Sequence, residues 1–154
     1  METDDSLTAL DPAYCKVLRI SASVQALVLL LIAGFLESLP PPPGSFLIPV
    51  ALLAIWLVAI APARRFSRWG YRLDGDLLRI TRGYLFYRDT VVPLGRIQHI
   101  DVQQGPLMRR YDLATLTVHT AGNLNAGVDL PGLRHDDALA MRETIRQHIK
   151  QAQP

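Results

Sequence analysis

Two long apolar stretches stand close together in the first third of the chain. They occupy residues 20–36 and 46–61, and a proline-rich segment, 37–45, joins them. Twenty residues of α-helix span about 30 Å, the thickness of the hydrocarbon core of a bilayer. The pattern predicts two transmembrane helices, 17–36 and 46–62.

The two helices are predicted to form a transmembrane hairpin over residues 17–63. The alternative is a pair of buried helices in a soluble core. Only about 90 residues remain outside the hairpin, too few to cover two helices that are apolar all round. A secretory signal peptide is excluded for the first stretch, because it lacks a small-residue cleavage site and a second apolar stretch follows at once.

Basic residues flank the hairpin on both sides, whereas the connecting segment 37–45 has none. The flanking residues are Lys16, Arg19, Arg64, Arg65, Arg68 and Arg72. Loops rich in Lys and Arg stay in the cytoplasm. Both termini are therefore predicted to be cytoplasmic, with residues 1–16 as a cytoplasmic N-terminal tail.

From residue 69 onward the apolar period changes to two. Apolar and polar positions alternate around Leu78 and Ile80, Ile100 and Val102, Leu116 and Val118, and Val128 and Leu130. This alternation is typical of antiparallel strands that pack on one face. Turn residues separate the strands at 74–76, 82–83, 93–95, 104–106 and 121–123.

The chain ends in a predicted helix. Asp136 and Asp137 lie in its first turn, and Arg146 and Lys150 in its last, which matches the helix dipole. An apolar stripe at spacings of three and four consists of Ala138, Met141, Ile145 and Ile149. The fold class is α+β: a partly open barrel of short strands closed by one helix. A stripe that binds a partner is the alternative role of this helix.

Composition argues against several kinds of function but indicates no activity. The net charge of +2, from fourteen Arg and two Lys against fourteen acidic residues, is too small to indicate nucleic-acid binding. The single Cys15 cannot form an internal disulfide. No nucleophile motif accompanies His99 or His119, and no metal-ligand spacing surrounds His135 or His148. We expect no catalytic residue, no metal and no cofactor.

Two groups of arginines are the candidate contact residues. Arg64, Arg65 and Arg68 follow the second apolar stretch, where each is able to gain about 1 kcal/mol on an anionic leaflet, although topology alone explains them. Arg109 and Arg110 form a second pair in the predicted loop after Pro106. They contact lipid headgroups, a partner or only water, and the sequence does not choose among these.

The segment 96–122 carries a resemblance. Its Arg-Ile-Gln, Gln-Gly-Pro-Leu-Met-Arg and Leu-Ala-Thr-Leu…Thr-Ala-Gly motifs, with Leu-Pro-Gly-Leu at 130–133, resemble the bacterial pleckstrin-homology (PH) membrane proteins of the YdbS type. The order of parts is also similar. The resemblance implies a PH-like split β-barrel of about seven strands with a C-terminal helix over 64–154, in the bacterial cytoplasmic membrane.

The resemblance supplies no activity and no catalytic residues. It implies a related multi-PH-domain membrane protein as a partner, with a homo-oligomer as the alternative. Asp112 stands where the family usually has Gly, which is tolerable if the backbone has φ > 0 there. The first hairpin loop is acidic, and Arg79 and Arg82 have opposite strand parity, so no specific phosphoinositide site is expected.

Three functions compete. The first is a membrane-anchored interaction or scaffold module at the cytoplasmic face. The second is a domain that senses anionic lipids without phosphoinositide specificity. The third, an enzyme or transport component, is disfavoured because neither apolar stretch contains a charged residue for an ion path.

Overall fold

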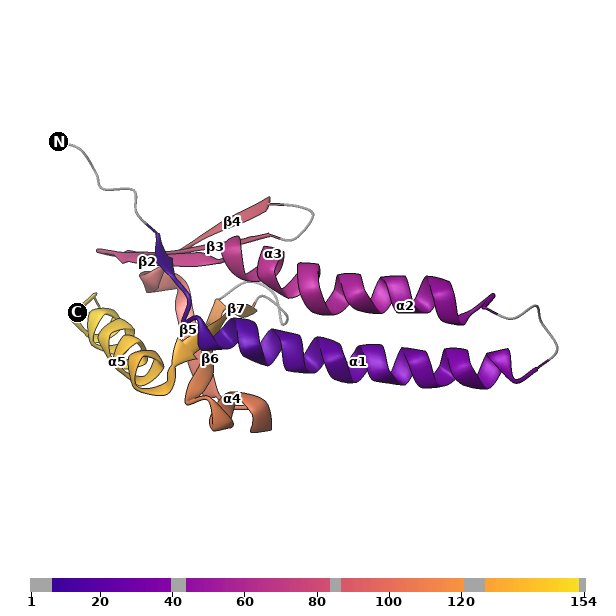
Figure 1. Ribbon diagram of the computed structural model, residues 1–154. Helices are drawn as coiled ribbons and strands as arrows, with labels where there is room; N and C mark the ends of the chain where they lie inside the picture. The colour runs from indigo at the N-terminus through magenta and orange to yellow at the C-terminus, as the bar shows by residue number, and fades with distance from the viewer. Residues whose placement is uncertain (1–6, 40–43, 84–86, 121–126, 153–154) are drawn as a thin grey trace. The chain divides into compact units, whose positions relative to one another are not determined.

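The computed structural model describes residues 7–39, 44–83, 87–120 and 127–152, and it divides into two compact parts. The helical part comprises residues 15–66. The sheet part combines residues up to Tyr14 with those from Ser67 onward. Figure 1 shows the order of the elements in both parts.

Helix α1 (Ala13–Glu37) starts four residues before the predicted boundary because Asp11 caps it. The Asp11 carboxylate accepts a hydrogen bond of 2.8 Å from the backbone N–H of Ala13. Pro12 lies between the cap and the first residue of α1, where its missing N–H costs nothing. The cap residue and the proline thus fix the start of the helix.

A second helical run extends from Leu47 to Ser67 without a break. It consists of α2 (Leu47–Ile55), a π-helical turn η1 (Trp56–Ile60) and α3 (Ala61–Ser67). Pro62 explains the wide turn, since a proline ring collides with the carbonyl four residues earlier in a regular α-helix. Pro49 lies in the first turn of α2, as predicted.

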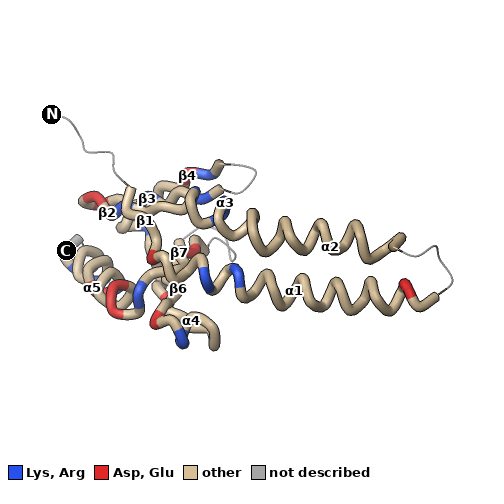
Figure 2. The backbone as a smooth tube through the Cα atoms, viewed as in Figure 1, with Lys and Arg blue, Asp and Glu red and all other residues tan. Residues whose placement is uncertain are grey.

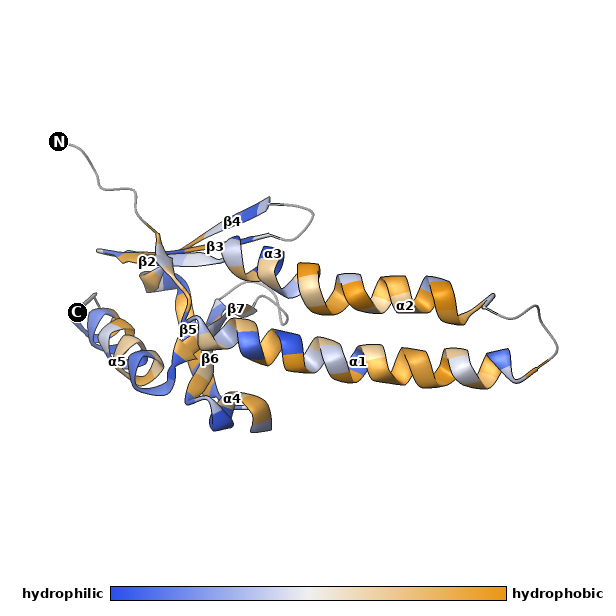
Figure 3. Cartoon of the chain, in the orientation of Figure 1, coloured by the Kyte–Doolittle hydropathy of each residue, from blue (hydrophilic) through white to orange (hydrophobic). Residues whose placement is uncertain are grey.

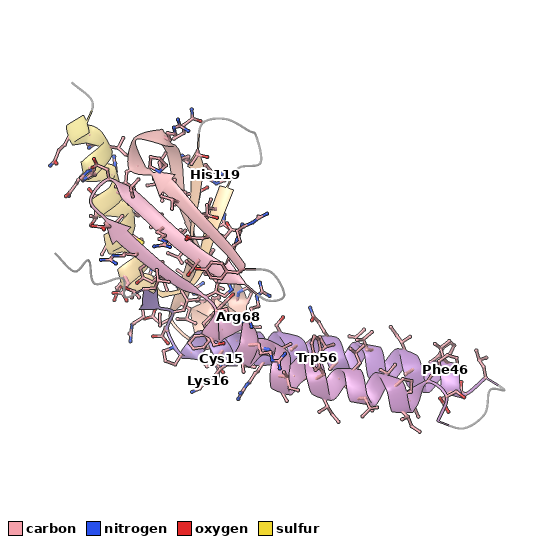
Figure 4. All side chains as sticks on the ribbon, turned by 90° about the horizontal axis from the view of Figure 1, so that it is seen from above. Cys15, Lys16, Phe46, Trp56, Arg68 and His119 are labelled. Atoms are coloured by element: carbon pink, nitrogen blue, oxygen red, sulfur yellow. The ribbon has the colours of Figure 1, made fainter. Side chains whose placement is uncertain are left out.

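Both helical runs are long and apolar enough to cross a bilayer. Figure 3 shows the apolar colour along most of their length, and Figure 2 shows few charges there. Their apolar side chains project outward (Figure 4), and several are more than 60% exposed: Leu31, Phe35, Ile48, Leu52 and Ile55. Apolar surface of this extent is typical of a face that contacts lipid or another protein.

Glu37 closes the connection between the two helical runs. Its carboxylate accepts hydrogen bonds from the backbone N–H groups of Gly44, Phe46 (3.1 Å) and Leu47 (3.3 Å). The first N–H groups of a helix have no partner within the helix and carry partial positive charge. The only acidic residue of the apolar region therefore caps the start of α2.

The sheet part contains two antiparallel sheets. The four-stranded sheet has the order β1-β2-β3-β4 and the three-stranded sheet the order β5-β6-β7. The bounds are β1 Thr8–Ala9, β2 Gly70–Asp74, β3 Leu77–Gly83, β4 Tyr87–Pro93, β5 Ile97–Gln103, β6 Leu113–Thr120 and β7 Gly127–Arg134. The predicted alternating strands and the α+β class are confirmed.

The predicted N-terminal tail, residues 1–16, differs from the structure because it contains strand β1. Thr8 lies opposite Tyr71 and Ala9 opposite Gly70, so the segment before α1 is hydrogen-bonded to the strand that follows α3. Leu10 and Tyr14, next in the chain, are only 3% and 4% exposed. The sheet part is therefore completed by residues that precede the helical part.

The core of the sheet part lies between the two sheets and α5 (His135–Ala152). Its fully buried side chains are Leu78, Ile80, Leu113, Leu116, Val118, Leu130 and Ile145. Of the predicted stripe on α5, Ala138 and Ile145 are buried, whereas Met141 and Ile149 are half-buried. A contact between the His148 imidazole and the Asp76 carboxylate joins α5 to the turn between β2 and β3.

Two short helical turns occupy the connections. η2 (Leu94–Arg96) separates β4 from β5 at the predicted break. The loop predicted after Gln104 is instead helix α4 (Pro106–Arg110), with Pro106 at its first position. Asp112, after α4, has φ 54°, the condition under which Asp is a tolerable replacement for the family's Gly. The predicted turn at 121–123 lies outside the described residues.

Candidate functional site

The predicted contact arginines are distributed over both parts of the chain. Arg64 and Arg65 lie in the last turn of α3, in the helical part. Arg68 belongs to the sheet part, and Arg109 and Arg110 form the last turn of α4. The second pair is thus carried by a helix rather than a loop, and both of its side chains are exposed.

A different set of arginines surrounds a cavity of about 550 Å³ in the sheet part, which we call the arginine cavity. Residues of both sheets line it: Arg82, Arg88, Asp89, Thr90, Val91, Val92, Pro93, Arg96, Thr120, Gly127 and Val128. Three arginines therefore line one open space. The pattern of the sequence does not reveal this group, because its members come from β3, β4 and η2.

Strand register brings two of these arginines together. Arg82 on β3 lies directly opposite Arg88 on β4. Directly opposed residues project from the same face of a sheet. Arg82 also shares its strand parity with Leu78 and Ile80, which are fully buried, so the arginine pair continues the core-facing side of the sheet.

Arg79 lies on the other face, as its parity predicted. Its guanidinium donates hydrogen bonds to both carboxylate oxygens of Asp89, at 2.6 to 3.1 Å. The bond from Arg79 holds the pKa of Asp89 below its ordinary value, against a smaller opposing effect of desolvation. The one carboxylate of the arginine cavity is thus already engaged.

A second cavity of about 550 Å³ lies between β5 and α5, and we call it the β5–α5 groove. It is lined by Ile97, Gln98, His99, Ile100, Arg142, Arg146, Ile149 and Lys150. Among the described residues, β5 is an edge strand, since it pairs there with β6 alone. The groove therefore combines an unoccupied strand edge with three basic side chains from α5.

Two histidines and one carboxylate meet on the exposed face of β5 and β6. The carboxylate of Asp101 lies 3.0 Å from Nε2 of His99 and 3.4 Å from Nε2 of His119, which Figure 4 labels. Both imidazoles lie on the more exposed side of their strands. No set of three such residues able to hold a metal ion occurs in the described residues.

Tyr71 links the first strands to the start of α5. Burial raises the pKa of its phenol, and the nearby carboxylate of Asp137 adds to that effect. The phenol thus stays protonated and neutral over the physiological range.

Comparison with known proteins gives one family and two relatives. The family model "Bacterial PH domain" matches residues 22–149. The chain is 33% identical over 98 residues to the transmembrane protein YdbS of Bacillus subtilis, covering 60% of each chain. It is 28% identical over 99 residues to the transmembrane protein YdbT of the same bacterium, covering 64% of this chain and 20% of that protein.

The chain therefore spans less than two thirds of the length of either relative. No solved structure matches it significantly. The two sheets and the C-terminal helix are consistent with the family, and the two apolar helical runs agree with the membrane location in the relatives' names. The chain is thus a membrane protein that belongs to the bacterial PH domain family.

Proposed function

We propose that this protein is a membrane-anchored interaction module whose PH domain binds a related PH-domain membrane protein at the cytoplasmic face. The observation that carries the proposal is the β5–α5 groove. It offers an exposed strand edge and, on α5, the basic residues Arg142, Arg146 and Lys150. An extended peptide can add to a strand edge through backbone hydrogen bonds, while neighbouring pockets select its side chains.

Charge determines the kind of segment that fits. Groups of opposite sign across an interface steer association and suppress wrong partners. The groove therefore suits an extended acidic segment. A related protein is the proposed source of this segment. One part of the much longer transmembrane protein YdbT is similar to this chain, so related PH-domain membrane proteins of larger size exist.

The helical part acts as the anchor. We propose that α1 and the run from Leu47 to Ser67 cross the membrane as a hairpin, with both termini in the cytoplasm. β1 and β2 support this, since hydrogen-bonded neighbours that flank the two helices must lie on one side of the bilayer. The basic flanks and the lack of Lys and Arg at 37–45 indicate the cytoplasmic side.

Site-specific photo-cross-linking in native membranes tests the proposed partner. A photoreactive residue at Gln98, in the groove, should give an adduct with a related PH-domain membrane protein, identified by mass spectrometry. The same probe at Gln147, exposed on α5 outside the groove lining, is the control. Reversing charge with Arg142→Glu and Arg146→Glu should abolish the adduct. Adducts that form equally from both positions, or only between copies of this chain, contradict the proposal.

A further inference from the structure

The arginine cavity has more positive charge than the described residues neutralise. Arg82, Arg88 and Arg96 line it, and no carboxylate of the described residues forms an ion pair with any of them. The lining carboxylate of Asp89 binds Arg79 instead. The cavity thus presents guanidinium groups whose hydrogen-bond donors are available to a ligand.

The arrangement does not help the protein to fold. Like charges directly opposite each other on neighbouring strands destabilise a sheet, and Arg82 faces Arg88 in the register of β3 and β4. A pair that opposes folding, on the side of the sheet that continues the core, is the kind of local conflict that marks a functional site. An anion between the two arginines would remove the repulsion.

Guanidinium groups favour one class of anion. Their planar N–H donors match the oxygens of phosphate in paired hydrogen bonds, which is why arginine is preferred where phosphate is recognised. The hydroxyl of Thr90 also lines the cavity and adds a neutral donor. Three arginines and a hydroxyl from two strands and η2 suit a compact, multiply charged phosphate group.

The cavity is close along the chain to the end of the second apolar helix. Gly70, the first residue of β2, lies opposite Thr81, and Arg82 is the next residue of β3. Only two residues separate Gly70 from Ser67, where α3 ends, and an extended chain covers at most about 3.5 Å per residue. Arg82 thus lies one residue beyond the strand position that pairs with the start of β2.

We propose that the arginine cavity binds a phosphate group through Arg82, Arg88 and Arg96. This site is separate from the β5–α5 groove, from the arginines at the end of α3 and from the pair on α4. The phosphate belongs either to a lipid headgroup or to a free phosphate compound. The chemistry of recognition is the same in both cases.

Ligand-dependent stability of the full-length protein in a neutral detergent tests the proposal. The probes are inorganic phosphate and dihexanoyl phosphatidic acid, with dihexanoyl phosphatidylcholine and chloride at equal ionic strength as references. The midpoint of thermal unfolding should rise with at least one of the two probes and not with the references. The probe that raises it identifies the source, and calorimetric titration then gives its Kd.

Single substitutions locate the binding. Arg88→Gln and Arg82→Gln should each raise the Kd roughly tenfold or more, since each removes charge-assisted hydrogen bonds. Without a probe, Arg88→Gln should unfold at or above the wild-type midpoint, because the opposed charges are gone. If either strand variant fails to fold, Arg96→Gln repeats the binding test, because Arg96 lies on an exposed turn.

The matched control is Arg109→Gln with Arg110→Gln, which removes two exposed positive charges from α4. It should leave the Kd for the effective probe unchanged within about twofold. The proposal is overturned by three results: no response to either probe, a full response in Arg88→Gln and Arg96→Gln, or an equal loss in the α4 control.

Discussion

Gly132 shows how a single residue joins distant segments of the chain. It has φ 74°, and a Cβ built there would lie 2.5 Å from Cγ of Tyr14. Its carbonyl accepts a hydrogen bond of 3.1 Å from the backbone N–H of Asp11. Its place in the Leu-Pro-Gly-Leu motif thus has a physical reason, since the glycine provides the surface on which the N-terminal segment packs.

Replacing Gly132 by Ala should destabilise the sheet part by about 1–3 kcal/mol, because both the positive φ and the contact with Tyr14 oppose a side chain. Gly95→Ala is the matched control, since nothing lies within 4 Å of a Cβ at that position. Thermal unfolding of the full-length variants in detergent measures the difference. Equal midpoints for the two alanine variants would contradict this role of Gly132.

The bond between Arg79 and Asp89 gives a second prediction for single residues. The pKa of Asp89 is lowered in the folded protein, so the pair stabilises the fold above the pKa of an unfolded aspartate, about 3.9. That stabilisation is lost as the pH falls through the lower pKa of the folded state. Asp89→Asn should therefore unfold below the wild type at pH 7, and the gap should close as the pH falls below about 4. A gap that stays constant down to acid unfolding refutes this account.

At the scale of elements, the alternating strands and the C-terminal helix follow directly from the sequence. The period of two around Leu78, Ile100, Leu116 and Val128 predicts β3, β5, β6 and β7, and each is present. The period of two does not predict helix α4 or strand β1. α4 is too short for a periodic signal, and β1 forms two residues of strand only because β2 supplies its hydrogen bonds.

Leu10 tests the contribution of the N-terminal segment. It follows β1 and is 3% exposed, so Leu10→Ala should destabilise the sheet part by about 2–4 kcal/mol, as deletion of a buried leucine side chain does. Leu77→Ala serves as the control, because Leu77 is 44% exposed. The free energy of unfolding, measured with denaturant, should separate the two. A fragment that starts at residue 64 should likewise be less stable than the full chain.

At the scale of the whole molecule, the pairing of β1 with β2 constrains how the chain enters the membrane. The two helical runs connect adjacent strands of one sheet. A single crossing would place β1 and β2 on opposite sides of the bilayer and is incompatible with their hydrogen bonds. The pairing therefore supports the proposed hairpin, in which both helical runs cross the bilayer.

Cysteine labelling tests the proposed orientation. In a Cys15→Ser background, Ser45→Cys should react with an impermeant maleimide in intact spheroplasts. Gln151→Cys, near the C-terminus, should react only after the membrane is permeabilised. Labelling of both positions from outside, or of Gln151→Cys alone, would disprove the orientation.

The sequence by itself determined the properties that depend on neighbours along the chain. Apolar length identified the two candidate membrane helices, period two identified most strands, and the ordered motifs of 96–122 identified the family. It also pointed to Asp112 as a departure from the family's Gly, and the backbone there has φ 54°. These features need no knowledge of which segments meet.

Only the tertiary structure decided what depends on register and on distant contacts. It paired β1 with β2 across the helical part, seated Tyr14 on Gly132, and placed Arg82 opposite Arg88 with Arg96 in the same cavity. The arginines look scattered in the sequence because their grouping depends on strand register. A shift of one residue in register would move each of them to the opposite face of its sheet. Register is fixed by the buried core as a whole, and so the grouping of charges emerges only when the sheets have formed.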